Sequence, residues 1–339
     1  MKDFEIYSNV GLRAPELSGG GPWLNSDPLA LRDLRGHVVL VDFWTYTCLN
    51  CLHTLPYIKG WQAKYTPFGL AVIGVHTPEF DFEREASNVV AAVRREGVLY
   101  PVVLDNERRI WQAFTNRYWP TRYLIDGKGM IRHHYVGEGG YRQTETALQE
   151  LLREAAPECA LPALAPAGPD EERGGFCLPA TPEVYCGYYR GLLANPEGYA
   201  RDRPHAYQAP AVAEEGLLYL QGTWTATAEY LRYGGAAPGG EGYLALRYRG
   251  LEANLVARPS EGGSPRVGVR RDGRPLGREL AGRDVAYDEG GESYVAITSA
   301  RLYNLVREDD GGPHLLELRP RGEGVELYSL TFGSCRVGR

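Results

Sequence analysis

DFWTYTCLNCLHTLP, residues 42–56, is the stretch of sequence that decides the fold. It overlaps the end of an apolar run, residues 38–43, of the kind that forms a central strand covered on both faces. It continues into a stretch of helical character from residue 49 to residue 65. Cys48 and Cys51 therefore lie where a buried strand ends and a helix begins.

This cysteine pair has the spacing and the setting of a redox-active disulfide. The thiolate is the reactive form of cysteine, and a free thiol is mostly protonated at neutral pH. At a helix N-terminus, unpaired backbone N–H groups and the helix dipole favour negative charge on sulfur. We therefore expect Cys48 to be the nucleophile. Cys51, one helical turn further on, would attack the mixed disulfide that Cys48 forms with a substrate, and no bound cofactor is needed.

Strand-like and helix-like segments alternate through the first half of the chain. After the first strand and helix, the pattern predicts a buried strand at 70–75, an amphipathic helix at 82–96, a short strand at 101–104, a helix at 107–114, strands at 121–125 and 130–136 around a turn, and a closing helix around 148–152. Strands alternating with helices, followed by a hairpin and a helix, predict an α/β domain with a mixed sheet over residues 1–156.

The composition changes near residue 156. Residues 157–180 are rich in proline and have few periodic apolar positions, which indicates a linker. Beyond it, Gly and Pro recur between short segments in which apolar and polar residues alternate, without a long helical pattern. This pattern predicts an all-β sandwich or jelly roll over residues 181–339.

Length and charge limit the classes of function. A chain of 339 residues is too long for one ordinary core and predicts two domains. The net charge is −6 and the arginines are scattered, so nucleic acid is not an expected partner. No apolar run is long enough to span a bilayer, and no signal-like apolar segment follows Met1. The protein is therefore expected in the cytoplasm if Met1 is the native start.

Four cysteines lie outside the CxxC pair: Cys159, Cys177, Cys186 and Cys335. Cys177 and Cys186 are near enough in sequence to close a short loop, and a bridge there would stabilise the fold by roughly 2–3 kcal/mol. Two free thiols in a reducing compartment are an equally good interpretation. The redox state of all four stays open.

The motif around the cysteine pair resembles that of the thioredoxin superfamily. By this resemblance, Asp42 is a buried acid that helps to deprotonate Cys51, although a structural cap or ion-pair role is the alternative. Pro56 stands where thioredoxins kink the active-site helix. In Trp119-Pro120-Thr121, the resemblance implies a cis-proline at Pro120, beside the cysteine pair, in a groove whose backbone pairs with an extended substrate.

Three further side chains near the motif are candidates for lesser roles. Trp44 is expected to be a core or site-wall aromatic rather than a cofactor contact. His53 is interpreted as an exposed helix residue, with a catalytic group as the alternative. Glu79 follows the end of a predicted strand, where it could share in proton transfer or be a solvated loop carboxylate.

Longer stretches are similar to the TlpA/ResA class and to the soluble part of the DipZ family. Residues 43–51 and 72–80 resemble the thioredoxin-like portion of DipZ, and its second domain is matched at 181–185, 222–224, 301–306 and 331–333. The resemblance implies a C-terminal jelly roll like a carbohydrate-binding module, an extracytoplasmic location and a CcdA-like membrane electron donor. The sequence departs from the TlpA/ResA pattern at Thr47, at Leu49-Asn50 and at Thr54.

The leading hypothesis is disulfide exchange on protein thiols in the reducing direction, and three alternatives are kept. A zinc site would need about four ligands, and Cys48, Cys51 and His53 supply three. A peroxidase is the second alternative, because Thr45, three residues before Cys48, matches a peroxiredoxin pattern. That pattern has proline where this sequence has Val41. A binding module is the third alternative, because fourteen tyrosines beyond residue 180 could form a glycan site or could simply pack between sheets.

Overall fold

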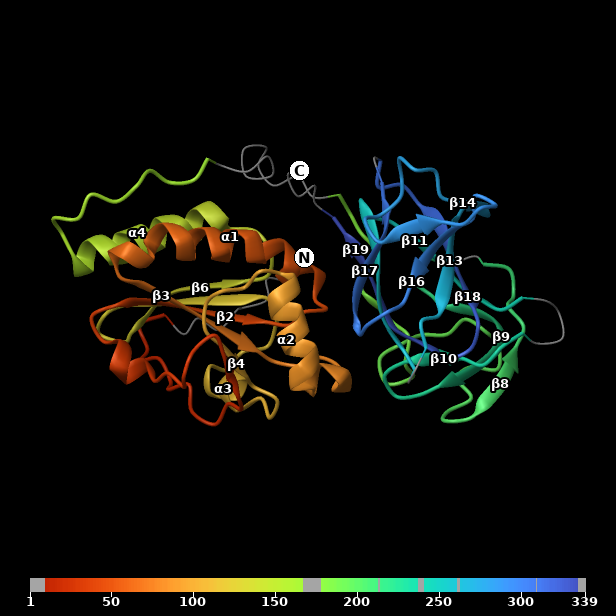
Figure 1. Cartoon of the computed structure of the whole chain (residues 1–339), viewed down its shortest axis with the longest axis horizontal. Coiled ribbons are helices and arrows are strands. Elements are labelled where there is room, and N and C mark those ends of the chain that lie inside the picture. Colours follow the sequence, from red (N-terminus) through yellow and green to blue (C-terminus); the bar gives the residue numbers. More distant parts are fainter. Residues whose placement is uncertain are drawn as a thin grey trace. The chain divides into compact units, whose positions relative to one another are not determined.

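The computed structural model describes residues 10–166, 178–212, 214–236, 241–260, 263–308 and 310–334. The chain divides into two compact units, Met1–Glu172 and Arg173–Arg339 (Figure 1). The division falls inside the segment 157–180 that the sequence predicts to be a linker. Within the described residues, no helix combines the length and the apolar character that a membrane crossing needs.

The first unit contains a mixed sheet of six strands in the order β1-β4-β3-β2-β5-β6. β2, β3 and β4 run parallel to their neighbours among these three, whereas β1, β5 and β6 pair in antiparallel fashion. The strands are β1 (Trp23–Leu24), β2 (Val38–Trp44), β3 (Leu70–His76), β4 (Val102–Leu104), β5 (Thr121–Ile125) and β6 (Ile131–Val136). The mixed sheet and its order confirm the predicted thioredoxin-like α/β fold.

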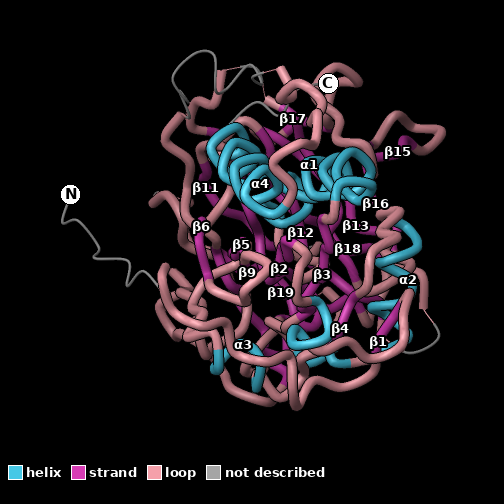
Figure 2. Tube along the Cα trace, turned by 90° about the vertical axis from the view of Figure 1, so that its left-hand side faces the viewer, coloured by secondary structure: helices cyan, strands magenta, loops and turns pink. Residues whose placement is uncertain are grey.

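Helices cover both faces of this sheet. The elements are α1 (Leu49–Tyr65), α2 (Ala86–Arg95), α3 (Arg109–Ala113), α4 (Tyr141–Ala155) and the 3-10 helices η1 (Leu31–Leu34), η2 (Thr66–Phe68) and η3 (Asp81–Arg84). α1 and α4 lie side by side, with α3 on the other side of the sheet (Figures 1 and 2), and the rings of Tyr57 and Tyr141 stack at 3.5 Å between α1 and α4. α1 has the predicted bounds and includes Pro56.

The sequence prediction of one helix over residues 82–96 is wrong at its start. The segment forms η3 and then α2, separated by an extended residue, Glu85 (φ −72°, ψ 114°). The physical reason is that Glu83 turns inward, and its carboxylate accepts hydrogen bonds from the backbone N–H groups of Glu79 and Phe80. The local turn is thereby satisfied without a continuous helix.

Alternation along β2 places the two halves of its side chains on opposite faces of the sheet. Val39, Val41 and Phe43 belong to the apolar cluster that contains α3, where the Phe43 ring meets the edges of Trp111, Phe114 and Tyr123. Because successive strand residues point to opposite faces, Asp42 points away from this cluster. A single acid is thus buried within an otherwise apolar strand.

Part of the predicted linker is ordered along α4. The side-chain amide of Gln149 donates to the carbonyl of Pro162 (2.7 Å), and the N–H of Ala165 donates to the carboxylate of Glu145 (3.1 Å to Oε2). Residues 157–166 therefore follow the helix instead of leaving it at once. Residues 167–177 of the segment lie outside the described residues.

The second unit is built from antiparallel strands, as predicted for an all-β sandwich. Ten of its strands follow the order β15-β16-β13-β18-β11-β9-β10-β19-β12-β17, and β7, β8 and β14 pair at the side of this path. The strands are β7 (Val184–Tyr185), β8 (Pro204–Tyr207), β9 (Tyr219–Ala226), β10 (Leu231–Tyr233), β11 (Tyr243–Tyr248), β12 (Glu252–Pro259), β13 (Arg266–Arg271), β14 (Arg274–Pro275), β15 (Val285–Tyr287), β16 (Ser293–Ala296), β17 (Arg301–Arg307), β18 (His314–Arg321) and β19 (Val325–Gly333).

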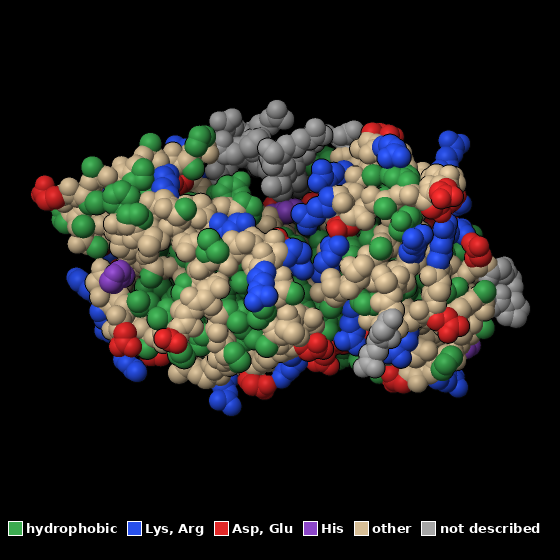
Figure 3. Space-filling model, viewed as in Figure 1, with side chains coloured by type: hydrophobic (Ala, Val, Ile, Leu, Met, Phe, Trp, Pro, Cys, Tyr) green, Lys and Arg blue, Asp and Glu red, His purple; other side chains and the backbone are tan. Residues whose placement is uncertain are grey.

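Several aromatic side chains of this unit belong to its core. Six of the fourteen tyrosines are buried: Tyr207, Tyr219, Tyr233, Tyr248, Tyr303 and Tyr328. Trp224 is also fully buried. On the surface, basic side chains are intermixed with acidic ones (Figure 3), as in the pairs Arg270–Glu292 and Arg321–Asp288, both at 2.8 Å. These tyrosines therefore pack between strands, which was one of the two interpretations of the sequence.

Gly74, opposite Asp42 in the neighbouring strand, generates the first prediction. A Cβ at this position would lie 3.0 Å from Trp44 Nε1 and 3.1 Å from Tyr100 Cε2. We expect Gly74→Ala to lower the free energy of unfolding by about 1–3 kcal/mol, because a close-packed interior must shift to admit the methyl group. Urea denaturation followed by tryptophan fluorescence measures the change.

The matched control is Gly60→Ala in α1, where an added Cβ meets no atom within 4 Å among the described residues. That substitution should stabilise by about 0.5–1 kcal/mol, because alanine loses less backbone entropy in a helix. Equal stability of Gly74→Ala and the wild type would show that the sheet tolerates a side chain beside Asp42.

Candidate functional site

The helix α1 begins at the cysteine pair. Cys48 is the N-cap residue of α1, and the backbone N–H of Cys51 donates to its sulfur (3.2 Å from N to Sγ). Cys48 is half-buried, whereas the exposed fraction of Cys51 is 1%. The accessible sulfur thus lies against an N–H group at a helix N-terminus, a position that favours a thiolate.

Cys51 is placed to react only after it loses a proton. Burial raises the pKa of the Cys51 thiol well above its usual range, and the hydrogen bond and charge of Cys48 raise it further. A protonated thiol is a poor nucleophile, so attack by Cys51 needs a nearby base.

Asp42 is the acid whose charge acts on Cys51, so it is the candidate for this base. It is buried in β2, in register with Gly74 on β3 and with Arg122 on β5. Burial raises the pKa of Asp42 to about 7, although the positive charge of Arg122 opposes this rise. The negative charge of Asp42 also raises the pKa of Cys51, which shows that the two groups interact. A carboxyl group with a pKa near 7 can accept or release a proton at neutral pH.

Arg122 is a member of the site that the sequence analysis missed. Its side chain is fully buried, although it stands within an ordinary-looking strand segment. It donates to the carbonyl of Gly139 (2.5 Å), and its guanidinium lies over the rings of Tyr135 (4.6 Å) and Tyr141 (5.1 Å). The arginine therefore places a positive charge opposite Asp42 in the sheet. Only this cross-strand pairing could have indicated its role from the sequence.

Unsatisfied polar atoms gather around Asp42. Among the described residues, Asp42 Oδ1, Trp44 Nε1 and the Tyr100 hydroxyl are buried without a hydrogen-bond partner. Burial raises the pKa of Tyr100, and the charges of Asp42 and Cys51 raise it further, so the phenol lies in the field of both groups. Trp44 is a fully buried wall of this region, as the sequence predicts for a core or site-wall aromatic.

A second buried carboxylate contacts the segment that leads into Cys48. The hydroxyls of Thr45 and Thr47 donate to Glu83 Oε1 at 2.6 and 2.5 Å. Glu79, the acid singled out from the sequence, supplies instead a backbone N–H to Glu83 Oε2 (2.5 Å). Burial raises the pKa of Glu83 to about 7. Sequence reasoning missed Glu83, because a polar residue inside a helical pattern is normally placed on its exposed face.

His76 completes this group from β3. Its ring nitrogen Nε2 lies 3.3 Å from the Thr45 hydroxyl. Burial lowers the pKa of His76 to about 3, so the ring is neutral throughout the physiological range. His76 consequently contributes a hydrogen-bonding group and no charge.

The predicted proline loop has the predicted geometry. The Trp119–Pro120 peptide bond is cis. Thr121 pairs with Phe43 of β2, so Pro120 is beside the end of β2 that leads to Cys48. The Trp119 ring packs 4.4 Å from that of Trp111.

His53 differs from the sequence interpretation in its surroundings. It is half-buried, and its Nδ1 lies 3.2 Å from both carboxylate oxygens of Glu138. Among the described residues, Cys48 and Cys51 do not belong to a group of three or more potential metal ligands. In the described part of the chain, one group of side chains has a spacing suited to a metal ion: Glu308, Asp310 and His314.

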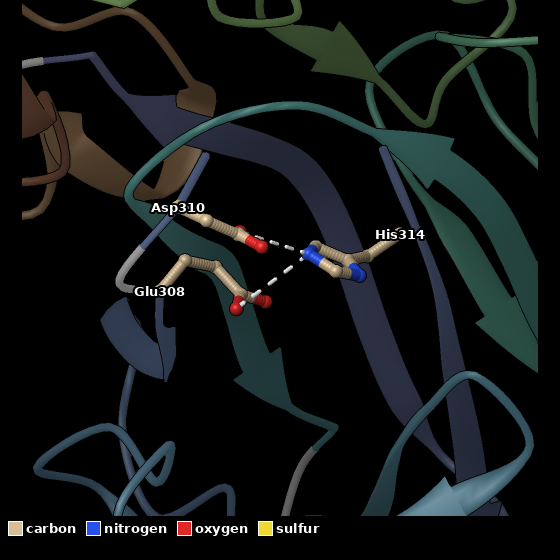
Figure 4. A group of neighbouring side chains, drawn as sticks. All are labelled: Glu308, Asp310 and His314. Carbon is tan, nitrogen blue, oxygen red and sulfur yellow. Dashed lines mark hydrogen bonds and ion pairs between the residues drawn. The ribbon is translucent and has the colours of Figure 1, made fainter. Parts of the chain in front are cut away.

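This group, which the sequence analysis did not single out, lies in the second unit (Figure 4). His314 Nε2 lies 3.4 Å from Asp310 Oδ1 and 3.8 Å from Glu308 Oε2. The guanidinium of Arg271 contacts both His314 Nε2 and Glu308 Oε1, each at 2.8 Å. Because a positive side chain already contacts the donor atoms, the group is better described as an ion-pair network than as a metal centre.

Of the four remaining cysteines, the structure describes two, Cys159 and Cys186. Cys186 is a buried free thiol, and burial raises its pKa; Cys159 is a half-buried free thiol. Cys177 and Cys335 lie outside the described residues, so the Cys177–Cys186 bridge stays a prediction.

Comparisons with known protein families match two separate parts of the chain. Residues 10–134 match the model of the AhpC/TSA family, and residues 181–333 match the family described as thioredoxin like C-terminal domain. Protein DipZ of Mycobacterium tuberculosis is 36% identical over 329 residues, which cover 94% of this chain and 43% of DipZ. The chain thus spans less than half the length of the DipZ proteins it matches.

Two shorter relatives each match about two fifths of the chain. Thiol-disulfide oxidoreductase YkuV of Bacillus subtilis is 26% identical over 140 residues, 41% of this chain and 94% of YkuV. Thiol-disulfide oxidoreductase ResA of Bacillus thuringiensis is 28% identical over 134 residues, 40% of this chain and 72% of ResA.

The buried acid Asp42 predicts a pH-dependent stability. In the unfolded chain an Asp has a pKa of about 3.9, whereas burial raises that of folded Asp42 to about 7. Between these values the folded state keeps a proton that the unfolded state has lost, so stability falls as pH rises. We expect Asp42→Asn to be roughly 2–4 kcal/mol more stable than wild type at pH 8 and equally stable at pH 4. Urea denaturation at both pH values measures this.

Asp126→Asn provides a control of opposite sign. Asp126 accepts backbone hydrogen bonds from Lys128 and Met130, and with Arg132 these lower its pKa. Its ionised form therefore stabilises the fold, and this variant should lose stability at pH 8 more than at pH 3. A difference between wild type and Asp42→Asn that stays constant from pH 4 to pH 8 would contradict a raised pKa at Asp42.

Proposed function

We propose that this chain, which is similar to DipZ over most of its length, is a thiol–disulfide oxidoreductase whose Cys48–Cys51 pair reduces disulfides in other proteins through a mixed disulfide. One observation carries the proposal. The half-buried Cys48 sulfur accepts the Cys51 N–H at the start of α1, while the Cys51 thiol lies buried and interacts with the charge of Asp42. An accessible nucleophile is thus paired with a protected second thiol.

The reaction would proceed in two exchanges. The Cys48 thiolate attacks one sulfur of a substrate disulfide, whose S–S bond breaks, and the released substrate thiolate takes up a proton. Asp42 then accepts the Cys51 proton, and the Cys51 thiolate attacks the Cys48 sulfur. The bond between Cys48 and the substrate breaks, and the second substrate thiolate is released and takes up a proton. The substrate has gained two electrons and two protons, and the protein is left with a Cys48–Cys51 disulfide.

The substrate would bind in the groove formed at Trp119-Pro120-Thr121. The neighbouring β5–β2 pairing holds this tripeptide at the end of β2 that leads to Cys48. The Pro120 carbonyl already accepts the N–H of Gly137 (2.8 Å), so this carbonyl is not the group that would pair with an extended peptide.

The oxidised pair must be reduced again by a dithiol donor. We propose a CcdA-like membrane protein in this role and an extracytoplasmic location, on the strength of the similarity to DipZ. No bound cofactor is proposed, because the cysteine pair itself carries the two electrons. The second unit is proposed to act in docking, while glycan binding is disfavoured by the burial of Trp224 and six tyrosines.

Peroxide reduction is the second candidate, favoured by the match to the AhpC/TSA family over residues 10–134. The Thr45 hydroxyl, which suggested a peroxiredoxin pattern, donates to Glu83. It is therefore engaged away from the Cys48 sulfur. Comparing the rates at which the reduced protein consumes hydrogen peroxide and reduces insulin disulfides separates the two functions.

Cys51→Ser should trap a mixed disulfide. Without Cys51 the intermediate on Cys48 cannot be resolved, so a covalent adduct with a disulfide-containing protein should accumulate and be visible by non-reducing electrophoresis. Cys48→Ser should form no adduct, and Cys159→Ser should behave like the wild type. Full turnover by Cys51→Ser would rule out the two-cysteine mechanism.

The reduction potential tests the proposed direction. A reductant of this type should have a potential near or below about −250 mV, close to that of thioredoxin. Equilibration of the protein with dithiothreitol buffers, followed by counting of Cys48 and Cys51 thiols by mass spectrometry, gives the value. A potential near about −120 mV would identify an oxidant and refute the reducing direction.

A further inference from the structure

Glu83 forms a buried network that the disulfide exchange described above does not use. Its carboxylate has an exposed fraction of 0% and accepts four hydrogen bonds. Two come from the hydroxyls of Thr45 and Thr47, and two from the backbone N–H groups of Glu79 and Phe80. Glu83 therefore joins the loop before Cys48 to the loop after β3.

The contacts around Glu83 fix the residues immediately before the nucleophile. Thr47 is the neighbour of Cys48 in the chain, and the carbonyl of Thr45 accepts the Cys48 N–H (3.4 Å). Between the two threonines, the ring of Tyr46 stacks on that of His76 at 5.5 Å. The backbone N–H of Thr77 also donates to the carbonyl of Trp44 (3.0 Å). The two loops are thus held together on both sides of Glu83.

Burying the Glu83 carboxylate costs free energy of folding, so a purely structural role explains it poorly. Among the described contacts of the Glu83 carboxylate, all four partners are N–H or O–H donors, and none is a basic side chain. A buried carboxylate loses its hydration, and well-packed apolar residues often stabilise an interior more than buried charges do. Perturbed, buried acids of this kind cluster at functional sites.

We propose that Glu83 is a positioning residue for the thiol reaction: by binding the Thr45 and Thr47 hydroxyls, it holds the Cys48 sulfur at the N-terminus of α1. The proposal rests on the proposed function, in which Cys48 is the nucleophile. The sulfur gains its reactivity from the Cys51 N–H and the start of the helix. A displaced Cys48 segment would weaken that contact and leave the thiol harder to ionise.

Thr47→Val and Thr47→Ser form a matched pair that tests this without a change of charge. Valine keeps the shape of the side chain but cannot donate to Glu83, whereas serine keeps the hydroxyl. Reduced full-length protein is alkylated with iodoacetamide from pH 5 to pH 9, and mass spectrometry quantifies the Cys48 peptide. We expect Thr47→Val to move the midpoint of the Cys48 profile upward and to slow alkylation at pH 7 about threefold, with recovery in Thr47→Ser.

Glu83→Gln is the second variant. The amide keeps one acceptor oxygen, but its NH₂ group must face N–H or O–H donors on one side, so part of the network is lost. Removing a nearby negative charge would by itself ease ionisation of Cys48. An upward shift of the alkylation midpoint in Glu83→Gln can therefore arise only from displacement of the segment.

Glu145→Gln controls for general loss of stability. Glu145 is another buried carboxylate of the first unit, and it binds Lys64 and Tyr65 at the far end of α1, both at 2.6 Å. This variant should unfold at a lower temperature than the wild type and leave the Cys48 profile unchanged. Profiles for Thr47→Val and Glu83→Gln that match the wild type, or a downward shift in Glu83→Gln, would overturn the positioning role.

The test stands apart from the proposed function because alkylation needs no protein substrate. A wild-type protein that fails to reduce insulin, but whose Cys48 profile shifts in Thr47→Val and recovers in Thr47→Ser, would refute the reductase and support the positioning role. If Glu83→Gln does not fold, the Thr47 pair alone decides.

Discussion

The hydrogen bond from the Cys51 N–H to the Cys48 sulfur is the contact on which the rest of the site depends. It exists because β2 delivers the chain directly to the start of α1, so that the first cysteine caps the helix and the second lies one turn inside it. Helix N-termini have unpaired N–H groups and favour negative charge. The same backbone geometry therefore exposes one sulfur to a substrate and shields the other.

Burial then gives the two thiols different roles, because it keeps Cys51 protonated until a base removes its proton. In the same interior, desolvation raises the pKa of Cys51 and brings that of Asp42 to about 7. The charge of Arg122 limits the rise of the pKa at Asp42, and its guanidinium donates to the Gly139 carbonyl and lies over the Tyr135 ring. A buried acid that was completely neutralised by an adjacent cation would stay ionised and be a weaker base. At Asp42 the effect of burial exceeds that of the Arg122 charge, so its pKa of about 7 lets it exchange a proton near neutral pH.

Much of this could be predicted from the sequence, because the decisive signals are local. The apolar run of β2, the helix that follows and the CxxC spacing all lie within residues 38–65, and the bounds of α1 were predicted correctly. The cis peptide at Pro120 followed from resemblance to a family. The burial of polar residues is not indicated by any local sequence pattern of this kind. Arg122 and Glu83 stand in segments where a charged side chain normally faces water, and only long-range pairing places them inside.

The failed helix prediction at 82–96 has the same origin as the missed carboxylate. Periodicity assigns residues to a face on the assumption that the helix continues, and the 82–96 prediction therefore gave no sign that Glu83 is buried. In the structure, the chain closes a short turn around Glu83 and restarts as α2 after Glu85. The hydroxyls that bind Glu83 come from Thr45 and Thr47, almost 40 residues earlier. A local pattern is thus broken where a distant segment, the one that carries the nucleophile, needs a hydrogen-bond acceptor.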